Sequence, residues 1–186
     1  MNPDNRPLPS ETWYALLRQG VETVAGKAVL AALEAETSAG LLEGLPMRYG
    51  PPTAQGLAWR AGRVAWNDLR RHNPAALGLE GLEYWLLPPR RRLSQGLRAL
   101  VAFCQAGGWG VSLEETAHEW RLDLHAVPAP TADPAHLWCW FLAGLVQEFL
   151  AWAGGARVYP LRGLTCAADP TARHPCRLSL GREPLD

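Results

Sequence analysis

The chain has 186 residues, 48% of them hydrophobic and 19% charged, and its 18 basic residues balance its 18 acidic ones. A chain of this length can build one core, and so apolar a composition excludes an intrinsically disordered protein. The balanced charge argues against nucleic acid or another polyanion as the partner. We therefore expect a single domain, residues 1–186.

The N-terminus, MNPDNRPLPSETWYALL, lacks the features of a secretory signal, because no basic start precedes an apolar run. The longest apolar stretch, residues 135–146, is interrupted by His136 and is shorter than the roughly 20 residues that span a bilayer. We expect a cytoplasmic protein with no membrane span. In that compartment its four cysteines are thiols or metal ligands rather than disulfides.

The first half of the chain predicts helices. Ser10 can cap the first of two helices within residues 10–38. Residues 45–52, LPMRYGPP, predict a loop because of their prolines and glycine. Apolar residues at helical spacing then predict helices at residues 53–72 and 90–105.

Arginines gather in these two helices, with only three acidic residues between positions 60 and 98. The basic residues are Arg60, Arg63, Arg70, Arg71, Arg90, Arg91, Arg92 and Arg98. In PPRRRLSQGLRAL they stand at a helix start, where cations oppose the helix dipole. We interpret the cluster as a solvated face, and the alternative is a site for an anionic group or a partner surface.

The second half predicts strands around one buried helix. Apolar residues with a period of two predict an antiparallel hairpin at residues 109–126, and residues 156–181 predict two more strands. Pro160 places the first of these at a sheet edge or a bulge. Between them, residues 134–153 are apolar almost all round, with Asp133 at the cap. The predicted fold is α+β, with helices packed on a roughly four-stranded antiparallel sheet.

Common catalytic motifs are absent from the sequence: it has no GxGxxG, no GxxxxGK[ST], no GxSxG and no HExxH. We name no catalytic residue, and the sequence leans away from an enzyme. The nine tryptophans stand mostly at core-facing spacings, yet so aromatic a domain can also line a cavity for a flat apolar ligand.

Cysteines and one glycine form a pattern in HLWCWFLAGLVQEFLAWAGGARVYPLRGLTCAADPTARHPCRLSL. A Cys-Trp pair opens the buried helix, and a glycine follows four residues on. An edge strand then ends in cysteine, and a last cysteine follows an acidic turn. Over residues 118–181 this resembles the 4-vinyl reductase domain family, and LEYWLLPPRRRLSQGLRAL resembles it more weakly. That family includes predicted hydrocarbon-binding proteins and the ligand-sensing domains of phenol-responsive transcription activators. Its fold is related to that of trafficking-complex subunits.

Taken alone, the spacing of Cys166 and Cys176 fits a disulfide, a metal site or a turn with two buried thiols. By the resemblance, these two residues and Cys139 fall where the sensor domains have zinc-binding cysteines. The sensors' glutamate ligand is replaced here by Gly163, and His174 is the nearest suitable fourth ligand. The resemblance therefore implies one structural zinc, in which Cys104, a core residue by its spacing, takes no part.

The resemblance also implies a ligand pocket. Trp120 falls near a tryptophan of the sensors' aromatic pocket, and we expect Trp120 and Tyr159 to contribute to an apolar cavity beside the helix at residues 134–153. The favoured function is a small-molecule-binding or sensory module for a hydrophobic or aromatic ligand. Such a module would pass occupancy to a homodimer or to a signalling or regulatory protein.

Two other functions stay open from the sequence. One is a tetrapyrrole vinyl-group reductase or its accessory protein, although the chain has no dinucleotide motif and we expect no reductase activity with nicotinamide cofactors. The other is a non-catalytic assembly adaptor that acts as a dimer.

Overall fold

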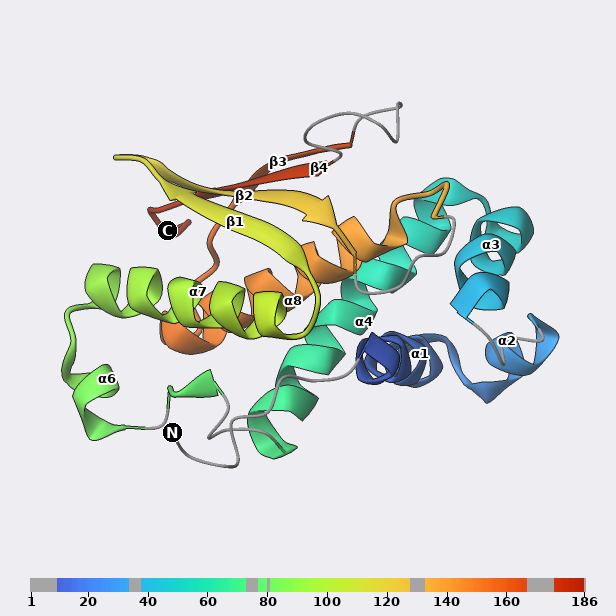
Figure 1. Ribbon diagram of the computed structural model, residues 1–186, viewed down its shortest axis with the longest axis horizontal. Helices are drawn as coiled ribbons and strands as arrows, with labels where there is room; N and C mark the ends of the chain where they lie inside the picture. The colour runs from blue at the N-terminus through green and yellow to red at the C-terminus, as the bar shows by residue number, and fades with distance from the viewer. Residues whose placement is uncertain are drawn as a thin grey trace.

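A computed structural model describes residues 10–33, 38–72, 77–79, 81–127, 133–166 and 176–185. Helices cover one face of a four-stranded antiparallel sheet, with α7 and α8 lying directly against it (Figure 1). The α+β fold predicted from the sequence is confirmed. Within the described ranges, no helix is both long and apolar enough to cross a membrane.

Six helices precede the sheet in the described part of the chain. They are α1 (Ser10–Ala25), α2 (Lys27–Ala32), α3 (Ser38–Tyr49), α4 (Pro51–His72), α6 (Leu82–Leu86) and α7 (Pro89–Ala106). The predicted helices at residues 53–72 and 90–105 correspond to α4 and α7, each of which begins one or two residues earlier than expected.

The predicted loop at residues 45–52 is wrong. Helix α3 continues through Pro46, and only Gly50, whose φ of 79° favours glycine, separates it from α4. The helix persists because it buries three fully covered leucines against the core, and that burial outweighs the hydrogen bond lost at Pro46. These leucines are Leu41, Leu42 and Leu45.

The four strands are β1 (Gly110–Glu115), β2 (Glu119–Ala126), β3 (Leu161–Cys166) and β4 (Cys176–Gly181), in the spatial order β1-β2-β4-β3. The predicted hairpin at residues 109–126 is therefore present, and β3 is an edge strand, as Pro160 indicated. Strand β4 pairs with both β2 and β3, so Leu124 and Cys166 both lie opposite Cys176. This register fixes where the two C-terminal cysteines meet.

Helix α8 (Leu137–Ala153) runs through the middle of the domain, as its apolar composition predicted, and it packs mainly on α4. It begins at Leu137 rather than at residue 134. Asp133 nevertheless caps it, because its carboxylate accepts hydrogen bonds from the backbone N–H groups of Leu137 (2.7 Å) and Trp138 (2.9 Å).

Candidate metal centre

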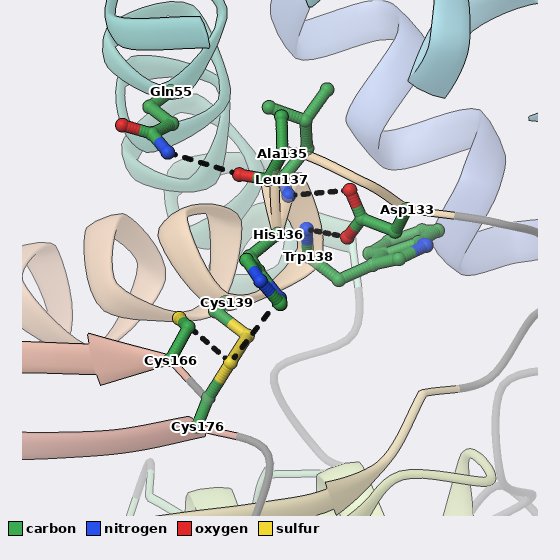
Figure 2. The surroundings of a disulfide bond; sticks show 9 residues. All are labelled: Gln55, Asp133, Ala135, His136, Leu137, Trp138, Cys139, Cys166 and Cys176. Atoms are coloured by element: carbon green, nitrogen blue, oxygen red, sulfur yellow. Dashed lines mark hydrogen bonds between the residues drawn. A yellow bond between two sulfur atoms is a disulfide. The ribbon is translucent and has the colours of Figure 1, made fainter. Parts of the chain in front are cut away.

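Three cysteines and one histidine meet where α8 reaches the end of the sheet. They are His136, Cys139, Cys166 and Cys176, and their ligating atoms all lie within 4.8 Å of one another. Figure 2 shows the His136 ring turned toward the three sulfur atoms. No other group of three or more His, Cys, Asp or Glu side chains with this closeness occurs among the described residues.

The sheet brings two of the cysteines together. Cys166 ends β3 and Cys176 begins β4, and the two residues are direct cross-strand partners. Their sulfur atoms lie 2.8 Å apart. The nine residues between them, 167–175, lie outside the described part of the chain, and so does His174, the fourth ligand expected from the sequence.

The start of α8 supplies the other two side chains. Cys139 lies in the first turn, and His136 is the N-cap residue, with Nδ1 3.9 Å from the sulfur of Cys176. His136 has a left-handed backbone conformation, with a φ of 55°. This conformation turns the chain into the helix and lets the imidazole face the sheet.

Neighbouring groups hold the turn before α8 in place (Figure 2). The Asp133 carboxylate accepts hydrogen bonds from two backbone N–H groups of the first helical turn. The side-chain amide of Gln55 donates a hydrogen bond to the carbonyl oxygen of Ala135 at 3.1 Å. Burial raises the pKa of Asp133, while the two backbone hydrogen bonds and His136 oppose that rise. His136 is therefore positioned by contacts that do not depend on a metal.

Cys139 and Cys176 are joined by a disulfide in the structure, with Cα atoms 6.5 Å apart. This differs from the expectation that all four cysteines are thiols or ligands. The disulfide links helix to sheet rather than closing the connection between Cys166 and Cys176. Once the bond is reduced, the same approach of side chains presents three thiol groups and one imidazole at a single point.

The donor set can bind a metal ion. Three thiolates and an imidazole form a common tetrahedral set, and donors 2.0–2.3 Å from one ion lie within about 4 Å of one another. The observed limit is 4.8 Å, and the sulfurs of Cys166 and Cys176 are 2.8 Å apart, so modest side-chain shifts after reduction of the disulfide would bring the four donors to that spacing. Cys104 lies elsewhere, buried on α7, where burial raises the pKa of its thiol to about 12.

Sequence reasoning missed His136 because it was treated only as an interruption of an apolar stretch. A usable signal was present: His136 and Cys139 are three residues apart at a helix start, a spacing that puts both on one face. The three cysteines expected at the site are brought together, although Cys139 is 37 residues from Cys176 in sequence.

The two residues expected in a ligand cavity pack on each other. Trp120 is fully buried, Tyr159 is 4% exposed, and their ring centroids lie 6.0 Å apart. The indole N–H of Trp120 donates to the hydroxyl of Ser94 at 3.3 Å, and the Arg182 guanidinium lies 5.4 Å from the ring centroid. Trp120 thus contacts Ser94 and Arg182, two residues of an arginine-lined groove beside α7, but Trp120 is not itself a lining residue.

The space between α8 and the sheet beside the metal centre is small. Leucines of β2, β3, β4 and α8, with Cys139 and Cys176, enclose a void of only about 10 Å³. That is about the size of one water molecule, so an apolar ligand does not fit there in this structure. The larger hollow is the arginine-lined groove, of about 570 Å³.

The fold and the donor set together define the class of protein: this chain is an α+β domain with a candidate Cys₃His metal centre. No family model matches the chain, and no curated protein or solved structure matches it either.

Proposed function

We propose that this chain is a small-molecule-binding or sensory module whose fold is stabilised by one zinc ion bound to His136, Cys139, Cys166 and Cys176. The observation that carries the zinc proposal is the convergence of these four side chains within 4.8 Å. This set of sulfur and nitrogen donors favours Zn²⁺ over Mg²⁺ or Ca²⁺, because the latter two ions prefer oxygen ligands. The ion would join the start of α8 to the ends of β3 and β4.

The stabilising effect follows from the places of the ligands. His136 and Cys139 belong to the central helix, and Cys166 and Cys176 belong to two strands of the sheet. Such a set does not exist in the unfolded chain, so the free energy of zinc binding stabilises the folded state. At a free zinc concentration about 100 times Kd, the gain is about 2.7 kcal/mol.

The test is elemental analysis of protein purified under reducing conditions from zinc-replete medium, combined with thermal unfolding before and after chelation. We expect about one zinc per chain and a lower Tm after chelation. The variant His136→Ala should bind zinc more weakly. The matched control His72→Ala alters an exposed histidine of α4 and should leave zinc content unchanged.

A third variant, His174→Ala, decides between the two candidate histidines. Zinc loss in His174→Ala but not in His136→Ala would return the site to the ligand set expected from the sequence. Wild-type protein carrying well under one zinc per chain would contradict the metal proposal altogether.

The proposal of a small-molecule ligand has separate support in the groove on α7. Its volume of about 570 Å³ lies within the range of small-molecule sites, and Ser94 connects its floor to Trp120. The resemblance to the 4-vinyl reductase domain family favours the same function. Dimerisation and a regulatory partner belong to this proposal as the route by which occupancy would be transmitted.

Native mass spectrometry of freshly purified protein separates this proposal from the two alternatives. A retained small molecule supports the ligand-binding module. A ligand-free dimer that stays ligand-free with every compound tried favours the assembly adaptor. Turnover of a divinyl tetrapyrrole by this chain with an added electron donor would instead establish the reductase.

A further inference from the structure

A groove lies along the first half of α7. Its lining comes from three separate parts of the chain: residues 87–98, which lead into and form the first half of α7, the end of β1, and the segment after β4. The lining residues are Leu87, Arg90, Arg91, Ser94, Gln95, Arg98, Glu115 and Arg182. At about 570 Å³ the groove is large enough for a small organic ligand.

The lining is strongly basic. Four guanidinium groups and one carboxylate line it, and one of the four, Arg90, is paired with Glu183 at 3.4 Å. Glu115 is already engaged, because Arg98 contacts it at 2.8 Å and Arg182 at 4.0 Å. Arg91 is exposed and, within the described ranges, makes no ion pair or side-chain hydrogen bond. The charge of the groove is therefore only partly compensated by the protein.

The helix itself adds to this positive charge. Helix α7 has Pro88 at its N-cap, no side-chain cap and no acidic residue in its first turn. Its first free backbone N–H groups, at Arg90 and Arg91, point out of the N-terminal end, where the helix dipole is positive. Arginines at this end oppose the dipole unless an anion lies between them.

The buried hydroxyl of Ser94 lines the groove, and among the described residues it accepts hydrogen bonds but donates none. Ser94 is only 9% exposed, and its oxygen accepts hydrogen bonds from the Trp120 indole (3.3 Å) and from Arg182 (3.5 Å). A hydroxyl has two acceptor positions and one donor, so both acceptor positions are used. In the described part of the chain the Ser94 oxygen has only these two accepted hydrogen bonds, so its O–H is available to a group in the groove.

We propose that this groove binds a small molecule through a phosphate group, which accepts hydrogen bonds from Arg91 and Ser94 and lies among the arginines. A phosphate carries up to two negative charges and three terminal oxygens, and so matches the charge and the donors better than a carboxylate does. Leu87 offers an apolar contact for the rest of the ligand. The inference rests on the proposed ligand-binding function and names the class of ligand.

Isothermal titration calorimetry with the full chain tests this inference, with phenyl phosphate as the probe and benzoate as the carboxylate comparison. We expect phenyl phosphate to bind more tightly than benzoate. The variant Arg91→Gln removes a charge that has no structural partner, and should weaken phenyl phosphate binding about tenfold or more. Arg60→Gln, an exposed arginine of α4 outside the groove, is the matched control and should bind like the wild type.

Three outcomes would overturn the inference: no binding of phenyl phosphate, equal weakening in Arg91→Gln and Arg60→Gln, or tighter binding of a DNA duplex than of phenyl phosphate at the same salt concentration. The Ser94→Ala variant provides a second reading, since it should weaken phosphate binding while the circular dichroism spectrum stays that of the folded protein. If these tests fail while native mass spectrometry finds a retained neutral ligand, the phosphate inference falls and the ligand-binding function stands.

Discussion

Helices α4 and α8 cross closely because glycine occupies the contact point on each of them. A Cβ at Gly144 would lie 1.8 Å from the carbonyl oxygen of Trp59, and one at Gly62 would lie 1.9 Å from the carbonyl oxygen of Phe141. Real Cβ atoms essentially never approach other atoms below 3.0 Å. The variant Gly144→Ala would therefore force the two helices apart by more than 1 Å.

The expected loss of stability follows from two opposing effects. Overpacking a core costs about 1–3 kcal/mol, and the upper end applies at Gly144 because the nearest atoms belong to the backbone of Trp59 and have no rotamer to change. Replacing a helical glycine by alanine also stabilises the helix by about 1 kcal/mol through its higher helix propensity. We expect Gly144→Ala to lower the free energy of unfolding by about 2 kcal/mol, and Tm by about 4–8 °C for a chain of this size.

Urea unfolding followed by circular dichroism measures this difference. The control is Gly56→Ala in α4, the helix that α8 crosses, where an added Cβ has no atom within 4 Å. That variant should gain about 0.5–1 kcal/mol from helix propensity alone. If Gly144→Ala proved as stable as Gly56→Ala, the close crossing of α4 and α8 would be refuted.

Three further predictions concern the cap, the buried thiol and the metal centre. Asp133→Ala should lower the free energy of unfolding by about 1–2 kcal/mol in urea, because two backbone N–H groups lose their acceptor. Iodoacetamide at about pH 8 should leave Cys104 unmodified until denaturant is added, as judged by peptide mass, because burial raises the pKa of the thiol to about 12 and keeps thiolate scarce. Diamide should drive zinc from the protein by forming the Cys139–Cys176 disulfide, and dithiothreitol with zinc should restore the metal content; zinc retained by fully oxidised protein would contradict this.

The parts of the fold that the sequence predicted are those with a strong local pattern. Helix α8 is apolar on nearly every side, and the hairpin of β1 and β2 alternates with a period of two. Pro160 has no N–H to donate, which is why the following strand lies at an edge. In each case the local chemistry and the tertiary position favour the same structure.

Helix α3 shows the opposite case. Its proline and its two glycines are typical of a loop, and nothing local indicates that residues 45–49 are helical. The helix forms because Leu41, Leu42 and Leu45 are fully buried by neighbours distant in sequence. Information of that kind is a property of the assembled core, and a window of the sequence does not contain it.

The candidate metal centre combines both cases, and the place of its candidate fourth ligand depends on the backbone conformation of one residue, His136. The resemblance to the 4-vinyl reductase domain family pointed to the three sulfur donors. His136 faces them with a left-handed backbone, in a turn that Asp133 and Gln55 hold in place. A ligand fixed before the ion arrives loses little conformational entropy on binding, which strengthens the site. His136 meets that condition through contacts with the helix start and with α4. This favours it over His174, whose proposed role rests on proximity in sequence alone.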